Sequence, residues 1–446
     1  MSRKNWSIDL NVAFHLRGLR VRVMGALNSN LLSCFRFLVI ACLVVGCWVM
    51  PLLGREPYRQ PKIRTITAFV RIEPSQYAQQ IQKAVTILRQ AKVAFEKSGY
   101  EVQSIRITTQ PFTEYIGGRS TVEALDFFKT LDDLSKKESF LLNIGRLTLS
   151  DSSDTAKVEL LSQILATTRA NASVAVAGED GVHWNAIRAA AQLMKYVEDH
   201  SPNGAYNFDF AAVAMVPPNV PFFPASNHDG AGHQFSVGWE AGAFVTDVLA
   251  GANGDVQVAR ELLSRGLEQQ ARVVDAIATQ VEKDSGWRYM GLDPTPAPNT
   301  DSSIGAAIEK LTGAKFGSSG TLTAAALITE AERSIPVKRI GYSGLMLPVL
   351  EDPVLAQRWS EGTFDLDSLL AYSAVCGTGL DAIPLPGDVS QQQLERIIGD
   401  VASLAFKWHK PLTARLIPAP GKKAGDRTDF DFGVARFPNT TVKPLR

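Results

Sequence analysis

Strand and helix alternate between residues 62 and 216, and this pattern is the strongest constraint on the fold. β-Branched and apolar runs predict strands, and segments with apolar residues on one helical face predict helices. The predicted strands are 62–72, 101–109, 140–144, 172–177 and 208–216, and the predicted helices are 75–98, 121–136, 155–168 and 183–199. Crossover helices connect parallel strands, so we predict an α/β fold with a largely parallel sheet. An open sheet and a closed barrel both fit the pattern.

Helices with short connections dominate the second half of the sequence. The predicted helices are 240–249, 256–281, 302–311, 321–333, 366–374 and 391–408. The sequence contains no Pro/Gly-rich linker that would split this region, and no repeat or low-complexity tract. We therefore predict a single α/β domain over residues 62–446.

The charge composition argues against nucleic acid as a partner. The chain is 45% hydrophobic and 20% charged, which is typical of a globular protein. Its 46 Lys and Arg residues against 45 Asp and Glu residues leave a net charge of +1, so no overall field attracts nucleic acid. We expect a small-molecule ligand and no nucleic acid, and a homo-oligomer is compatible with the sequence.

The N-terminal region carries an apolar run. Residues 37–53 are apolar without interruption, and extending the segment to residues 31–53 makes a helix long enough to cross a bilayer. The sequence therefore predicts a basic leader over 1–30, a hydrophobic signal or transmembrane helix over 31–53 and a linker over 54–61. On this basis we predict a membrane-anchored or exported protein with its domain outside the cytoplasm.

The fate of the hydrophobic segment stays open. A retained anchor, a cleaved signal and lipidation at Cys47, which ends a loose lipobox match, all fit the sequence, and a buried core helix is a further alternative. Cys34, Cys42 and Cys47 lie in or beside this segment. Cys376 is thus alone in the predicted domain, which excludes a disulfide within it.

Four loop-like segments combine Gly, Pro and polar side chains, as functional loops do. The first, FFPASNHDGAGHQFSVGWE, contains His228, a candidate ligand-binding residue, with Asp229, His233 and Glu240 nearby. A divalent cation is a candidate cofactor for such a set, although the HExxH spacing is absent and loop structure is the alternative. The identity of any metal is unknown from the sequence.

The second and third segments supply further candidates. In GWRYMGLDPTPAP, Asp293 follows a strand-like run and is a candidate catalytic carboxylate, with a turn as the alternative role. In GYSGLMLPVLEDP, we take Ser343, Gly344 and Glu351 as candidate ligand-binding residues. The final glycine of a G-x-S-x-G elbow is missing, so a hydrolase serine is poorly supported. Glu351 with its neighbour Asp352 also fits a helix N-terminus.

The fourth segment, AVCGTGLDAIPLPGD, concentrates the most chemistry. Cys376, Asp381 and Asp388 are candidate catalytic residues, because a thiol and two carboxylates can serve as nucleophile, acid–base group or cation ligand. Gly377 and Gly379 would let the backbone approach a ligand closely. The alternative for Cys376 is a buried, inert thiol.

These segments together resemble the domain-of-unknown-function 711 family, also called uncharacterised protein family 0210. The resemblance rests on KIRTIT, FFPASNHDG, GLDPTPAP with SSIGAAIE, GYSGLMLPVLED, CGTGLDAIPLPGD and KPLTARLIPAPGKKAGD. It covers nearly all of residues 62–446, and only the hydrophobic leader departs from the usual cytosolic form. The resemblance implies a fold similar to pyruvate formate-lyase, an α/β barrel of about ten strands.

Pyruvate formate-lyase chemistry does not follow from the resemblance. Glycyl radical enzymes carry an R-V-x-G-[FYW] pattern near the C-terminus, whereas this chain has FDFGVARF around Gly433. The family implies no settled activity for any residue. We predict an enzyme acting on a small molecule at the Cys/Asp-rich loop, and not a glycyl radical enzyme. A non-catalytic protein that binds a small ligand or cation, and a purely structural role, are the alternatives.

Overall fold

A ten-stranded sheet organises the chain, in a computed structural model that describes residues 58–149, 154–432 and 438–445. The strands are β1 (Lys62–Val70), β2 (Ile105–Thr109), β3 (Leu141–Leu147), β4 (Asn171–Gly178), β5 (Gly181–Val182), β6 (Phe210–Ala214), β7 (Gln234–Glu240), β8 (Arg288–Asp293), β9 (Gly379–Pro386) and β10 (Leu412–Ala419). Their order is β8-β7-β1-β2-β3-β4-β6-β10-β9, and the short β5 pairs with β4.

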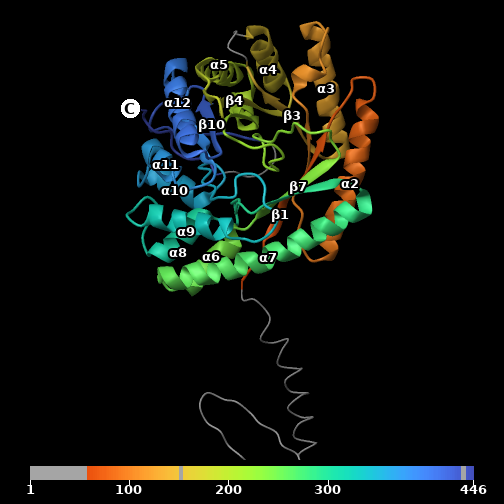
Figure 1. The fold of residues 1–446 in the computed structure, drawn as a ribbon. Coiled ribbons are helices and arrows are strands. Elements are labelled where there is room, and N and C mark those ends of the chain that lie inside the picture. Colours follow the sequence, from red (N-terminus) through yellow and green to blue (C-terminus); the bar gives the residue numbers. More distant parts are fainter. Residues whose placement is uncertain (1–57, 150–153, 433–437, 446) are drawn as a thin grey trace, which may run out of the picture. The chain divides into compact units, whose positions relative to one another are not determined.

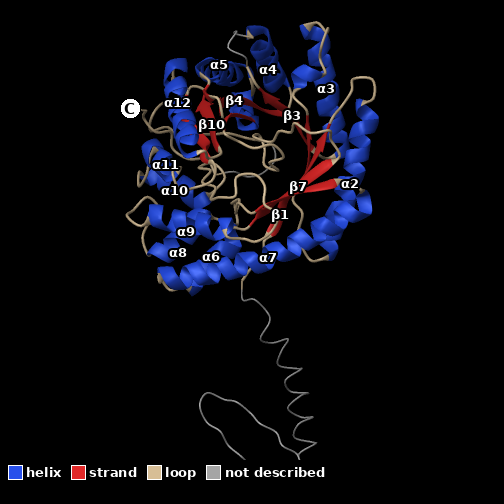
Figure 2. Ribbon diagram, viewed as in Figure 1, coloured by secondary structure: helices blue, strands red, loops and turns tan. Residues whose placement is uncertain are grey.

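Helices connect and cover these strands (Figure 1). They are α2 (Tyr77–Lys97), α3 (Thr121–Glu138), α4 (Thr155–Thr167), α5 (Trp184–His200), α6 (Gly242–Gly251), α7 (Val256–Ser285), α8 (Ile304–Thr312), α9 (Thr321–Arg333), α10 (Pro353–Glu361), α11 (Leu366–Tyr372) and α12 (Gln391–Trp408), with 3-10 turns at Phe112–Glu114 and Pro202–Asp209. Figure 2 shows helices around the outside of the view and strands and loops within it.

Local sequence signals explain where several helices begin. Ser120 and Ser390 each start a helix with a capping box, in which the side chains of the cap and of the third helical residue satisfy two backbone amides. Ser303 caps α8, as one of the two serines expected there, and Asp352 caps α10. These caps stabilise helix ends whose amides have no partner within the helix.

The sheet is largely parallel, as predicted, but it is mixed, because two neighbouring pairs along the strand order are antiparallel. β1, β2, β3, β4 and β6 run parallel, as the first-half alternation predicts. β7 is antiparallel to β1, and β10 is antiparallel to β6. The chain reaches β7 from β6 through residues 215–233, which contain no crossover helix, so β7 runs in the opposite direction. Segments expected to be loops contain β7 and β9, whereas β8 corresponds to the strand-like run expected before Asp293.

The two faces of the sheet differ in chemistry because strand side chains alternate. In β2, Ile105 and Ile107 belong to the large hydrophobic cluster that includes the helices, while Arg106 and Thr108 point away from it to residues 222–226. The same apolar and polar alternation holds at Leu142–Asn143, Ala172–Ser173, Val237–Gly238–Trp239–Glu240 and Leu412–Thr413–Ala414–Arg415. The face away from the helices is therefore polar, and the loop that contains residues 222–226 packs against it.

One extended segment, residues 338–350, contacts both edge strands. The Leu292 amide in β8 donates to the Lys338 carbonyl at 2.8 Å, and the Ile340 amide donates back to the Leu292 carbonyl at 3.0 Å. At the other end, the amides of Val349 and Leu350 donate to carbonyls of β9, each at 3.2 Å. The segment thus connects the two ends of the strand order by backbone hydrogen bonds.

The predicted membrane anchor and the location outside the cytoplasm require correction. Within residues 58–149, 154–432 and 438–445, no helix is long and apolar enough to cross a membrane. The segment 31–53 on which both predictions depended lies outside the described residues, as does Gly433. Neither prediction is kept.

Candidate functional site

Asp381 and Arg415 form the centre of a buried ion cluster on the polar face of the sheet. They lie on the paired parallel strands β9 and β10, and a register shift between Ala414 and Leu416 brings them together. Arg415 Nε lies 3.1 Å from Asp381 Oδ1, and their side chains are 6% and 8% exposed. The Nη2 group of Arg415 also pairs with Glu351. One arginine thus joins two buried carboxyl groups.

The cluster continues from Glu351 across the sheet. Arg64 Nη2 in β1 lies 3.3 Å from Glu351 Oε2, and Arg64 Nη1 lies 3.8 Å from Glu240 Oε2 in β7. Gln103 and Asn299 donate hydrogen bonds to the same Glu240 oxygen at 2.6 and 3.1 Å. Strands and loops far apart in the sequence therefore share one network of charges.

Burial raises the pKa values of carboxyl groups in this cluster. The pKa of Asp381 rises to about 6, because desolvation, aided by the charge of Glu351, outweighs the attraction of Arg415. Burial also raises the pKa of Glu240, against hydrogen bonds from Gln103 and the charge of Arg64. Asp381 is consequently half-ionised near pH 6 instead of near pH 4, which brings its pKa closer to neutral pH, as an acid–base group needs.

A small cavity of about 20 Å³ adjoins Asp381. Its lining consists of Phe222, Phe223, Pro224, Ala225, Tyr342, Met346, Thr378, Asp381 and Thr413. The Thr378 hydroxyl is buried and has no hydrogen-bond partner among the described residues, while the hydroxyls of Tyr342 and Thr413 bond to each other. The volume accommodates about one water molecule. The cavity thus places a free hydroxyl and a titratable carboxyl around one water-sized space.

Asp293 holds the turn that delivers Tyr342 to the cavity. Its carboxylate accepts hydrogen bonds from the amides of Tyr342 and Ser343 at 2.8 and 3.1 Å, and from the amide and hydroxyl of Thr295 at 3.1 and 2.6 Å. Burial raises its pKa to about 6, against these hydrogen bonds. The structure therefore brings Asp293 and Ser343 together in a backbone-supporting arrangement outside the cavity lining.

Gly344 and Gly377 allow two backbone segments to cross. A Cβ atom on Gly377 would lie 2.4 Å from the Gly344 carbonyl carbon, and one on Gly344 would lie 2.6 Å from the Gly377 Cα. The Gly377 amide donates to the Leu345 carbonyl at 2.7 Å. Gly379 begins β9 with a φ of 87°, which favours glycine. These glycines position Thr378 and Asp381 through backbone packing.

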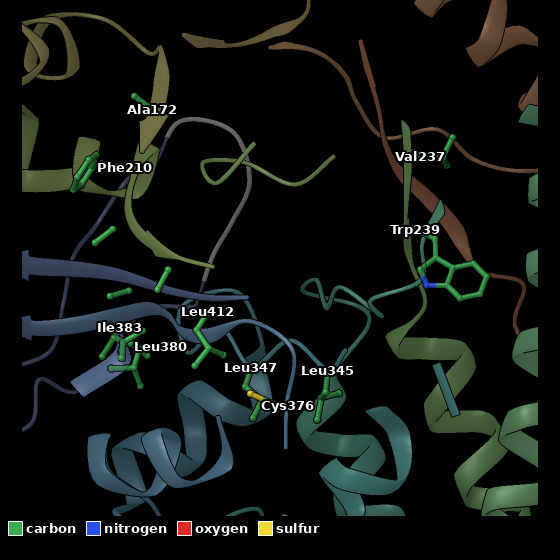
Figure 3. Packing of buried hydrophobic residues seen from close by; sticks show 14 of the residues in the cluster. Ala172, Phe210, Val237, Trp239, Leu345, Leu347, Cys376, Leu380, Ile383 and Leu412 are labelled. Carbon is green, nitrogen blue, oxygen red and sulfur yellow. The ribbon is translucent and has the colours of Figure 1, made fainter. Parts of the chain in front are cut away.

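Cys376 lies in the hydrophobic core. Its side chain is fully buried in the cluster that contains Leu345 and Leu347, and Figure 3 shows it among these side chains. Two buried ionisable groups interact with it, Glu332 and Lys410, and the Nζ of Lys410 donates to the Ser373 carbonyl at 2.8 Å. These surroundings resemble those of an inert structural thiol.

Asp388 and His228 lie apart from the cavity lining. Asp388 is exposed, two residues beyond the end of β9. His228 is buried with its Nε2 3.1 Å from the Val70 carbonyl, and burial lowers its pKa. In the described ranges no group of three or more His, Cys, Asp or Glu side chains is placed to hold a metal ion.

The sequence analysis did not single out the buried arginines on the polar face of the sheet, Arg415 in the ion cluster and Arg106 on β2. Arg106 and Arg415 each stand between apolar residues of a strand, in the pairs Ile105–Ile107 and Ala414–Leu416. An isolated charge at a strand position, flanked by residues that face the core, was the available signal. Such a charged residue indicates which face of the strand is polar, even when its interaction partners are unknown.

Comparison with known proteins establishes the family. Residues 57–431 match the model described as Uncharacterised ACR (DUF711). The chain belongs to this family. The resemblance derived from the sequence motifs is thereby confirmed, and the DUF711 match covers all ten strands of the sheet and all residues of the ion cluster.

Named relatives carry no activity in their descriptions. A UPF0210 protein of Pyrobaculum aerophilum is 31% identical over 367 residues, which cover 77% of this DUF711 chain and 80% of the relative. A UPF0210 protein of Bifidobacterium longum subsp. infantis is 27% identical over 352 residues, covering 74% and 77%. Among solved structures, the anaerobic ribonucleotide reductase of Thermotoga maritima matches with a TM-score of 0.35 and 8% identity over 79% of this chain and 80% of that one. A TM-score this low supports no argument about chemistry.

Proposed function

We propose that this protein is an enzyme that transfers a proton to or from a small molecule, with Asp381 as the acid–base residue. The observation that carries the proposal is the position of Asp381 in the cavity lining, buried and next to Arg415, with a pKa raised to about 6. A carboxyl group with a pKa near the working pH exchanges protons in both directions. Perturbed carboxyl groups that line a cavity are typical of catalytic sites.

The residues around Asp381 would orient the reacting group and position the Asp381 carboxyl group. The unpartnered hydroxyl of Thr378 is available to orient the reacting group, and the hydroxyl pair of Tyr342 and Thr413 closes the opposite side. Arg415 fixes the orientation of Asp381 and stabilises its carboxylate form. In this form Asp381 accepts a proton from the substrate, and in its protonated form it returns one. Only a group of about the size of one water molecule fits the cavity, so the substrate presents a small hydroxyl, carbonyl or water there.

The same proposal includes closure of the sheet into a barrel. The hydrogen bonds of residues 338–350 to β8 and to β9 support it, since this segment occupies the place between the two edge strands. Closure would explain why Tyr342, near the start of the segment, and Glu351, just after it, both belong to the site. Slow hydrogen exchange at the amides of Ile340, Val349 and Leu350 is the expected result, and exchange as fast as in an exposed loop would contradict closure.

A comparison of variants in an extract of small metabolites tests the enzyme proposal. Purified wild type, Asp381→Asn and Asp400→Asn are each incubated with the extract, and consumption is followed by mass spectrometry. Asp400 is exposed on α12 and serves as the matched control. We expect wild type and Asp400→Asn to consume the same compound and Asp381→Asn to leave it unchanged. A compound retained by wild type but never consumed would instead favour a binding protein, and equal consumption by Asp381→Asn would refute the role of Asp381.

A further inference from the structure

Arg106 is a buried cation without an anionic partner. It lies on the polar face of β2 with 8% of its surface exposed. Its Nε group donates to the Ser104 hydroxyl at 3.1 Å, and its guanidinium carbon lies 5.0 Å from the centre of the Phe223 ring. Across the ranges 58–149, 154–432 and 438–445, it forms no ion pair with a carboxylate.

Arg415, the other arginine that is buried among the described residues, is paired. It contacts Glu351 and Asp381. An unpaired charge in a protein interior is costly, because its lost hydration is not replaced by a partner. Arg106 therefore differs from Arg415 in a way that a missing ligand would explain.

The carboxyl groups around Arg106 are paired with other arginines. The guanidinium groups of Arg64 and Arg415 both act on Arg106, and Glu351, the carboxylate that does so, is shared between these two arginines. Desolvation, with the repulsion of Arg64 next, lowers the pKa of Arg106 to about 9, so the group is still a cation at neutral pH. Arg64 also pairs with Glu240 and Arg415 with Asp381, so that of these three arginines Arg106 is the one without a carboxylate partner in the part of the chain that the structure describes.

Phe223 links Arg106 to the catalytic cavity. Its ring packs against the Arg106 guanidinium, and the same residue lines the cavity beside Asp381. A molecule bound at Arg106 would therefore lie along Phe223, with its reacting end near Asp381.

We propose that Arg106 binds the oxyanion of a small anionic substrate, a carboxylate or a phosphate, whose reacting group reaches Asp381. This inference rests on the proposed function and names its substrate class. The planar guanidinium can donate two parallel hydrogen bonds to either kind of oxyanion. The anion would give Arg106 the negatively charged partner that it lacks, and would leave the Asp381–Arg415 pair in place.

Anion titrations of the full chain test this assignment. Inorganic phosphate, acetate and succinate are titrated into wild type, Arg106→Gln and Arg265→Gln, and binding is measured by calorimetry and by the shift in Tm. Arg265 is exposed on α7 and is the matched control. We expect at least one of the anions to bind wild type and Arg265→Gln equally, and to bind Arg106→Gln at least tenfold more weakly. Arg106→Lys should recover part of the loss. Preference for phosphate over the two carboxylates, or the reverse, identifies the oxyanion.

Two results separate this inference from the proposed function. Equal binding to wild type and Arg106→Gln, or no binding of any of the three anions to wild type, would overturn the anion site whatever Asp381 does. Asp381→Asn should still bind the anion, because its carboxyl group does not contact Arg106. If Asp381→Asn both binds the anion and turns over substrate like wild type, the anion site stands and the acid–base role fails.

Discussion

Asp381 and Arg415 face each other on adjacent parallel strands, with Oδ1 and Nε 3.1 Å apart in a buried setting. Arg415 also pairs with Glu351, so its removal would leave the buried Asp381 without a cation and Glu351 with Arg64 alone. We expect Arg415→Met to lower the free energy of unfolding at pH 7 by about 3–5 kcal/mol. Urea unfolding followed by circular dichroism measures this. Arg265→Met, at an exposed position, should unfold like wild type. If the two variants behave alike, the pair does not contribute to stability.

The raised pKa of Asp381 predicts how stability changes with pH. The folded protein keeps this proton up to a pH of about 6, whereas the unfolded chain releases it near the ordinary value of 3.8. The folded state therefore binds more protons between these two pH values, and this group lowers the free energy of unfolding as the pH rises through the interval. Above it, both states are ionised and the contribution stays constant.

Asp381→Asn removes this contribution. Its free energy of unfolding relative to wild type should increase as the pH rises from about 4 to about 6, and should then level off. Arg415, Glu351 and Tyr342 are the titratable groups whose charges act on or respond to Asp381. Asp293 titrates in the same range but is present in both proteins, so its effect cancels. A pH-independent difference between the two proteins would show that the pKa of Asp381 is not raised by folding.

The crossing of Gly344 and Gly377 is sensitive to a single methyl group. Gly377→Ala places a Cβ atom 2.4 Å from the Gly344 carbonyl carbon, where two backbones would have to separate. We expect a loss of about 3 kcal/mol, the upper end for over-packed cores. Thermal unfolding provides the measurement. Gly117→Ala is the control, because its Cβ atom would meet no atom within 4 Å. Similar Tm values for both variants would show that the close approach is absent in solution.

Cys376 should be chemically silent in the native protein. Its side chain is fully buried among apolar groups, so an alkylating reagent has no access to it before unfolding. Iodoacetamide treatment followed by peptide mass spectrometry distinguishes Cys376 from Cys34, Cys42 and Cys47. We expect the peptide containing Cys376 to be modified only after denaturant is added. Rapid native modification would restore thiol chemistry as an alternative for this site.

The first half of the fold could be predicted because its signals are local. Strands such as β2 alternate with helices whose apolar residues fall on one face, and each crossover fixes the direction of the next strand. We expected a loop in place of β9 because the segment is dense in glycine and proline, with Pro384 and Pro386 within the strand. An edge position in the strand order tolerates prolines, but that position depends on long-range pairing.

The candidate site was predictable only in part for a similar reason. Asp381 and Glu351 could be singled out because they stand in segments dense in glycine and proline. Arg415 joins these two residues, and this contact depends on the register between β9 and β10, which no local sequence pattern shows. Asp388 is close to Asp381 in sequence but lies beyond the end of the strand. Sequence proximity thus grouped residues that the sheet separates.

The rate of substrate turnover in Asp381→Asn at neutral pH tests the central claim most directly. On the compound that wild type consumes, the variant should retain the wild-type fold by circular dichroism and lose activity about a hundred- to ten-thousand-fold. Asp400→Asn should keep the wild-type rate. A folded Asp381→Asn protein that turns over the compound within a factor of two or three of wild type would contradict an acid–base role for Asp381.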